Sequence, residues 1–418
     1  MRQTVGKFLF ELANPPGDYH FQAAGEEVCF VERPRKRIRW SRLRVLALTA
    51  SVVATAELSP ARATDVPPLR VIKDQDPNFN TLSVDLVNDE ILVGNDAQET
   101  LQVYSRSAQG LVAPLREIGG QKTFLTFPGQ VIIDPVHNEI WNVGNDIADL
   151  ITVYPRTASG NVAPIRRIDG KRPQLRFNRS WGISLDMVND ELFVTHQKRN
   201  QISVFARTTN TDADRHATSK RTIRGPATGL ANAHGIFVDP KANEIYVANL
   251  GHQVAKDPTT GLPVGTTHLP SINVYARNAK GNAAPLRTIQ GPNTKLDNAK
   301  PIFIDSERHQ IVVANGSPTH ALLFFDQKAN GNVAPIRVIQ GENTELRDPT
   351  GVFVDTVHHE VLVANWGNHT ITVYPSGASG NVKPQRVISP TKSRVAAGIG
   401  NPGAIYVDPE RDEIGVAN

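Results

Sequence analysis

Short apolar runs alternate with polar stretches along most of the chain, and the runs recur in a constant order. One complete unit contains GIFVD at 235–239, EIYVAN at 244–249, INVY at 272–275 and PLRTI at 285–289. Each run is rich in Val, Ile, Phe or Tyr and is bounded by Gly, Asn, Asp or Pro, which is typical of β-strands. Each unit therefore predicts four short strands, which we call A to D in chain order.

The aspartate that ends strand A marks the repeat, and it recurs at intervals of 49 to 66 residues. Its seven copies are Asp85, Asp134, Asp186, Asp239, Asp305, Asp355 and Asp408. Four short strands repeated at such a period predict an all-β fold, a β-propeller of seven blades with four antiparallel strands each. The seventh unit shows only strands A and B before Asn418, so we expect its blade to be incomplete and the ring to be closed by the D-type strand at 68–72.

Several motifs occur in nearly every unit and indicate architecture, because a single active site does not need seven copies. An Asp-x4-Glu pair, such as Asp186 and Glu191, spans the A–B turn, where we expect the aspartate to accept turn N–H groups. Strand D carries an arginine, such as Arg221, which we expect to lie along neighbouring side chains. Glycine and leucine stand five residues apart in the D–A loops, and we expect the leucine to fill the gap between blades.

Residues 1–63 differ from the repeats and predict an export leader. The segment 33–44 is rich in Lys and Arg and has no acid, 45–56 is a weakly apolar run, and an A-x-A triplet ends at residue 63. These are the three parts of a secretory signal peptide. We therefore expect an N-terminal extension with a signal peptide, followed by a single propeller domain at 64–418. Export predicts a periplasmic or extracellular protein, and the apolar run is too short to form a stable membrane anchor.

The formal charge of +4 suggests an acidic partner until its location is considered. Of the 45 Lys+Arg and 41 Asp+Glu, residues 1–63 hold ten bases and six acids, which leaves 35 of each and no net charge on the propeller. We therefore expect no nucleic-acid partner. The one cysteine, Cys29, cannot form an internal disulfide, and it excludes zinc or iron–sulfur sites that need paired cysteines.

Residues that break the repeat near the predicted ligand-binding face are the better functional candidates. In the usual propeller layout the B–C and D–A loops share this face. Strand B ends at this face, with an asparagine in most units and with His196 in the third unit. The asparagine side chains could line the polar mouth of a ligand site. Other exceptions precede strand A or follow strand B, where the fourth unit also has a long insertion at 250–271. The candidate ligand-binding residues are Asn95, Asn145, Trp181, His196, His234, Asn249, His252, Asn315, His320, Asn365, Trp366 and His369.

The GIxVD, EIYVAN, ITVY and PxRxI series resembles bacterial NHL-repeat propellers, and more loosely the YVTN-like and SMP-30 or lactonase-like propellers, over about residues 68–418. The resemblance implies the architecture of a repeat protein. It does not decide the activity, because propellers include both enzymes and binding modules.

Two functions stay open. The first is a secreted or periplasmic binding scaffold that recognises a protein, peptide or glycan through the B–C/D–A face; we expect it to be a monomer without a cofactor. The alternative, implied by the lactonase-like resemblance, is a metal-assisted hydrolase or lyase in which His196, His234, His252 and His369 hold a divalent metal that polarises a carbonyl or activates water. The chain has no G-x-S-x-G, P-loop or H-E-x-x-H motif, so no catalytic residue is assigned and an enzymatic activity stays uncertain.

Overall fold

A computed structural model of the chain describes eleven segments, and the predicted signal peptide lies outside them. The segments are 28–32, 70–73, 79–96, 98–144, 150–169, 180–210, 217–251, 268–368, 370–388, 404–408 and 411–417.

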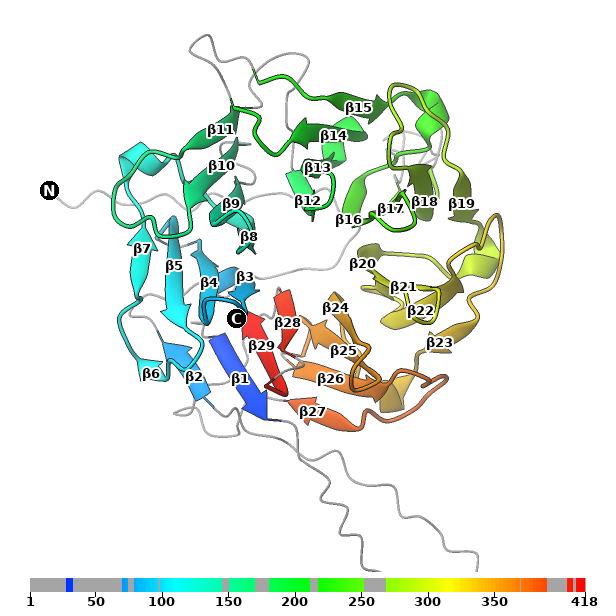
Figure 1. The fold of residues 1–418 in the computed structure, drawn as a ribbon. Helices are drawn as coiled ribbons and strands as arrows, with labels where there is room; N and C mark the ends of the chain where they lie inside the picture. The colour runs from blue at the N-terminus through cyan, green and yellow to red at the C-terminus, as the bar shows by residue number, and fades with distance from the viewer. Residues whose placement is uncertain are drawn as a thin grey trace, which may run out of the picture.

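The described strands form a β-propeller, with radial sheets arranged in a ring (Figure 1). Within the described residues, six sheets have four antiparallel strands each, and we number these blades one to six in chain order. From the centre outward, blades one to three are β3 (Phe79–Asp85), β4 (Glu90–Asn95), β5 (Thr100–Ser105) and β7 (Arg116–Ile118); β8 (Pro128–Asp134), β9 (Glu139–Gly144), β10 (Leu150–Pro155) and β11 (Arg166–Asp169); and β12 (Ser180–Asp186), β13 (Glu191–His196), β14 (Gln201–Ala206) and β15 (Arg221–Arg224).

Blades four to six repeat the same order. They are β16 (Ala233–Asp239), β17 (Glu244–Asn249), β18 (Ser271–Ala276) and β19 (Arg287–Gln290); β20 (Ala299–Asp305), β21 (Gln310–Asn315), β22 (Ala321–Asp326) and β23 (Arg337–Ile339); and β24 (Pro349–Asp355), β25 (Glu360–Asn365), β26 (Thr370–Pro375) and β27 (Arg386–Ile388). The predicted runs A to D are therefore the four strands of each of these blades.

The remaining sheet brings together strands from both ends of the chain (Figure 1). Its order is β28 (Ala404–Asp408), β29 (Glu413–Ala417), β1 (Val28–Glu32), β2 (Arg70–Lys73) and β6 (Gly110–Leu111). The first four strands pair antiparallel, whereas β6 pairs parallel with β2. Of the seven four-stranded blades that the sequence predicts, the described residues form six. The remaining sheet is a mixed one of five strands.

Strand β1 occupies the place that the third strand takes in the other blades. The sequence patterns had not predicted a strand at these residues. Phe30 lies opposite Arg70, just as Val373 lies opposite Arg386 in blade six. Hence the strand predicted at 68–72 does belong to the closing sheet, but it pairs with β1 instead of with β29 directly. A signal that could have found β1 is the run VCFVER at 28–33, which matches strand-C runs such as ISVFAR at 202–207.

Short 3₁₀ turns lie in the loops at one end of the strands. They are η1 (Gln121–Thr123), η2 (Gln197–Arg199), η3 (Pro226–Thr228), η4 (Pro292–Thr294) and η5 (Glu342–Thr344). No helix in the described segments has the length and hydropathy needed to cross a membrane.

The apolar core lies between the blades. A cluster of buried residues combines Leu101 of blade one, Tyr154 of blade two and Leu125 of the loop that joins them. Leu230 and Leu346 are buried in equivalent clusters. The prediction that the leucine of the D–A loop fills the gap between blades is therefore confirmed.

Glycine and asparagine hold four of the described D–A loops against the next blade. Gly225 has φ +134°, and a Cβ atom there would lie 2.4 Å from Asn282 Oδ1, so a side chain would not fit. The same Oδ1 accepts a hydrogen bond from Ala227 N–H at 2.7 Å. Equivalent asparagines in three other C–D turns accept such bonds from Lys122, Asn293 and Asn343. The Gly-Asn turn therefore braces the neighbouring blade as well as reversing its own chain.

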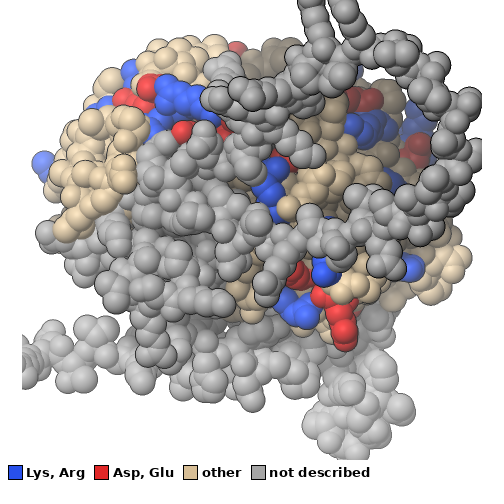
Figure 2. Space-filling model, turned by 90° about the horizontal axis from the view of Figure 1, so that it is seen from below, with Lys and Arg blue, Asp and Glu red and all other residues tan. Residues whose placement is uncertain are grey.

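Basic and acidic side chains are interspersed on the face shown in Figure 2. Lys and Arg lie beside Asp and Glu there, and neither sign gathers into a large patch among the coloured atoms. This distribution accords with the zero net charge of residues 64–418.

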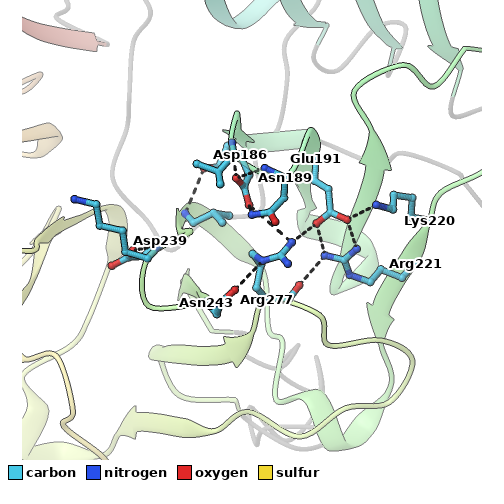
Figure 3. Close-up of polar contacts among 12 residues, drawn as sticks. Asp186, Asn189, Glu191, Lys220, Arg221, Asp239, Asn243 and Arg277 are labelled. Atoms are coloured by element: carbon cyan, nitrogen blue, oxygen red, sulfur yellow. Dashed lines mark hydrogen bonds and ion pairs between the residues drawn. The ribbon is translucent and has the colours of Figure 1, made fainter.

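The recurrent acids and arginines form ion-pair nodes at the A–B turns (Figure 3). Asp186 Oδ1 accepts the N–H groups of Val188 and Asn189 at 3.0 Å each, which confirms the predicted turn role. Glu191 of blade three accepts from Arg221 of its own strand D and from Arg277 of blade four, each at 2.7 Å. The arginines thus do more than lie along their neighbours, because they join adjacent blades through one carboxylate.

Candidate ligand-binding site

The strand-B asparagines point into the blades, where they hold the loops. Asn249 is fully buried, accepts a hydrogen bond from Ala231 N–H at 3.1 Å and donates to Ser271 Oγ at 3.1 Å. Asn315 and Asn365 are also fully buried and accept from D–A loop N–H groups. These three amides therefore bond to the loops of their own blades, and the polar mouth and its contact with a ligand stay predictions.

The remaining two candidate asparagines come from the strand-B runs of the first two units. Asn95 is fully buried, and its Oδ1 accepts a hydrogen bond from Gln98 N–H at 3.3 Å. Asn145 lies outside the described residues.

His196 is enclosed in blade three. It is fully buried, with Nδ1 at 2.9 Å from Ser180 Oγ and Nε2 at 3.0 Å from Ser203 Oγ. Burial, with a smaller contribution from the charge of Arg199, lowers the pKa of His196 to about 3. The imidazole is therefore neutral at physiological pH, and both ring nitrogens are engaged with serine hydroxyls.

Trp181 and His234 come together at the start of the inner strands of blades three and four. Their rings stack with centroids 5.0 Å apart and planes at 19°. The strands approach closely here, because a Cβ atom on Gly182 would lie 2.4 Å from the carbonyl oxygen of His234. Thr195 Oγ1 donates a hydrogen bond to the same carbonyl at 3.0 Å, which fixes the position of His234.

His320 belongs to a polar cluster between blades five and six. Its Nδ1 accepts a hydrogen bond from the Asp348 N–H at 2.9 Å. Asp348 Oδ1 in turn accepts a hydrogen bond from Lys300 Nζ at 3.3 Å. Burial lowers the pKa of His320, against the opposing effect of Asp348. Trp366 lies beside this cluster and donates its backbone N–H to the Asp348 carbonyl at 3.2 Å.

Of the four histidines proposed to hold a metal, the described part of the chain contains His196 and His234. His252 and His369 lie outside it, as does most of the 250–271 insertion. Among the described residues, no three His, Cys, Asp or Glu side chains are grouped as a metal site would require.

A pocket of about 490 Å³ opens between blades one and two on the predicted ligand-binding face. It lies at the B–C loop of blade one and the D–A loop that leads into blade two, and it reaches the ends of β10 and β11. Its lining residues are Gln98, Glu99, Gly120, Gln121, Phe124, Leu125, Thr126, Leu150, Arg167 and Asp169. The volume lies within the roughly 300–1,000 Å³ of small-molecule sites.

Two phenylalanines distinguish the D–A loop of this pocket from its equivalents. Phe124 has φ +59° at the position where the other described loops have Gly229, Lys295 and Glu345, all with φ between 58° and 66°. Phe127, at φ +36°, takes a place that is Asn232 or Asp348 elsewhere. A bulky residue with positive φ is uncommon and often marks a functional site. Phe124 is nevertheless 45% exposed, so burial of its ring does not explain its presence.

Arg167 packs against Phe124 from the outer strand of blade two. Its Cζ lies 4.5 Å from the Phe124 ring centroid, a cation–π contact. Its guanidinium has no hydrogen-bond acceptor among the described residues, because the one hydrogen bond of this residue, to Asn210 Oδ1 at 2.8 Å, comes from its backbone N–H. The five N–H donors of Arg167 are therefore available at the pocket wall.

The pocket also contains an unsatisfied hydroxyl. Thr126 Oγ1 is buried and has no hydrogen-bond partner among the described residues. Buried polar atoms without partners are rare in folded proteins, and a bound group is one explanation for them.

Phe124, Thr126 and Arg167 are absent from the residues selected by sequence. The comparison between units would have found Phe124, because aligning the D–A loops on their glycine and leucine places an aromatic residue where the other loops have Gln, Gly, Lys or Glu. It would not have found Thr126 or Arg167, because their importance depends on the packing of blade one against blade two.

Comparison with known proteins adds no family to this geometry. No protein-family model matches the chain, and a search of curated proteins found no match either. The chain is therefore identified here by its architecture, a β-propeller.

Proposed function

We propose that the protein is a binding scaffold of the NHL-like propeller type, which captures its ligand on the B–C/D–A loop face. The observation that carries the proposal is the pocket between blades one and two, where Phe124 breaks the repeat in an exposed position. An exposed aromatic ring beside converging polar groups on a rigid ring of blades suits recognition.

The proposal extends to the setting in which the scaffold acts. The basic segment, apolar run and A-x-A triplet in residues 33–63 support export to the periplasm or the cell exterior. The absence of net charge on residues 64–418 supports a partner other than nucleic acid. The braced blades could work as a monomer, and the closing sheet would serve as the seventh blade of the ring.

Array binding tests the scaffold proposal. The full chain, labelled and purified, is applied to one array of glycans and one array of short peptides, together with Phe124→Ala and Lys295→Ala. Lys295 occupies the equivalent loop position with the same φ of 59°, so it is the matched control. We expect retention of a ligand by the wild type and by Lys295→Ala, and its loss in Phe124→Ala. Equal retention by all three proteins, or retention by none, would contradict the proposal.

A further inference from the structure

We propose that the pocket between blades one and two binds a neutral saccharide. This inference rests on the proposed function and names its ligand class. The pocket wall combines one exposed aromatic ring with planar polar side chains that include both hydrogen-bond donors and acceptors.

The aromatic ring provides a platform for the C–H face of a sugar ring. Phe124 projects from a loop whose backbone conformation is repeated in three other blades, so its position is set by the scaffold. Arg167 stacks on the ring and orients it, while 45% of the residue stays exposed. An apolar ring face held in this way can pack against the C–H groups of a ligand, because such contacts depend little on the orientation of the two partners. Leu125 and Leu150 extend the apolar part of the wall.

The polar groups match hydroxyls, which donate and accept at once. Arg167 supplies donors, Glu99 supplies acceptors, and the amide of Gln121 supplies both. A ligand with many hydroxyl groups can satisfy such a mixed set. The partnerless Thr126 Oγ1 on the same wall would gain a partner from one of those hydroxyls.

The charges of the wall favour a neutral ligand over an ionic one. Among the described lining residues, the guanidinium of Arg167 is balanced by the carboxylate of Glu99. A carboxylate or phosphate ligand that paired with Arg167 would meet the like charge of Glu99, which disfavours it. A cation would in turn meet Arg167, so an uncharged, hydroxyl-rich molecule fits best.

Calorimetric titration of the full chain tests the ligand class. The probes are maltose, cellobiose and chitobiose, with N-acetylglycyl-glycine as a carboxylate probe. We expect at least one disaccharide to bind, with an affinity reduced at least tenfold in Phe124→Ala and also reduced in Arg167→Gln. Lys295→Ala and Glu345→Ala, at equivalent positions in other loops, should bind like the wild type.

A second variant separates a lost site from a damaged fold. Phe124→Lys copies the residue that blade five's loop tolerates in the same backbone conformation, so it should keep the melting temperature of the wild type while losing the disaccharide. Carboxylate binding that depends on Phe124, without disaccharide binding, would overturn the saccharide inference and leave the scaffold proposal standing. Disaccharide binding unaffected by Phe124→Ala and Phe124→Lys would also overturn it. Absence of any ligand on the arrays and in the titrations would overturn both proposals.

Discussion

His196 shows how one replacement in a repeated position changes the chemistry of a blade. Asparagine ends strand B in the equivalent blades, whereas blade three places an imidazole between two serine hydroxyls. The pKa of His196 falls from 6.5 to about 3 on folding. Between pH 3 and pH 6.5 this imidazole is therefore protonated in the unfolded chain and neutral in the folded chain. The free energy of unfolding is therefore fully maintained above pH 6.5 and decreases as the pH falls towards 3.

We predict that His196→Asn removes this pH dependence. Asparagine is tolerated at the same position in blades four to six, so the variant should fold. At pH 5 the wild type should lose about 2 kcal/mol of stability through this residue relative to neutral pH, and the variant should not. Urea unfolding at pH 5 and 7.5 measures the difference. Parallel losses in both proteins would show that His196 is not the group responsible.

At the scale of the elements, the outer strands are joined by ion-pair nodes. Burial by itself would raise the pKa of Glu191, but hydrogen bonds from Arg221 and Lys220 outweigh it and lower the pKa to about 2. The same pattern lowers the pKa of Glu90, which Arg116 and Arg156 approach. Blade five has Gln310 in this place, which accepts from Arg337 through its amide oxygen at 2.7 Å. The contact with the strand-D arginine is therefore kept when the carboxylate is replaced by an amide.

We predict that Glu191→Gln destabilises the protein by about 1–3 kcal/mol at pH 7, because two arginines lose a charged acceptor whose side chain is 4% exposed. Since the folded pKa of Glu191 is depressed, its contribution is present above about pH 4.5 and is lost as the pH falls towards 2. Urea unfolding at neutral pH measures the loss, with Gln310→Glu as the reciprocal variant. Gln310→Glu should be neutral or stabilising beside Arg337, and destabilisation of equal size by both changes would contradict this interpretation.

At the scale of the whole molecule, one strand from near the N-terminus completes the ring. β1 pairs with β29 on one side and β2 on the other, so it links the two ends of the chain. Without β1, neither neighbour would have this antiparallel partner, and the closing sheet would present two unpaired edges.

We predict that Phe30→Pro in the full chain lowers the melting temperature by at least roughly 3 °C, because proline removes a backbone donor and is not accommodated in a central strand. Phe30→Thr, which keeps the backbone N–H and suits a strand, is the control and should have a smaller effect. Differential scanning calorimetry compares them. Equal melting temperatures for wild type and Phe30→Pro would mean that β1 does not hold the ring closed.

Export would change this closure. If the leader is removed after the A-x-A triplet, the mature chain begins near Thr64 and lacks β1, which would leave β28, β29, β2 and β6 to close the ring. We expect N-terminal sequencing of protein recovered from the periplasm or medium to give a start near Thr64. A start before Val28 would contradict cleavage at that place and would keep β1 in the sheet.

Local patterns such as GIFVD at 235–239 were enough to predict the repeating architecture, because strands, tight turns and buried leucines follow from them. The closing strand was missed because β1 pairs with residues about 40 and 385 positions away, and a short apolar run does not specify so distant a partner. The candidate site was missed for a related reason. Only the packing of one blade on the next placed Arg167 on Phe124, and only the folded backbone brought the strand-B asparagines to the loop N–H groups that they bind. Tertiary structure decided these points because they depend on which side of a strand or loop faces a neighbour, a choice that side-chain identity alone does not make.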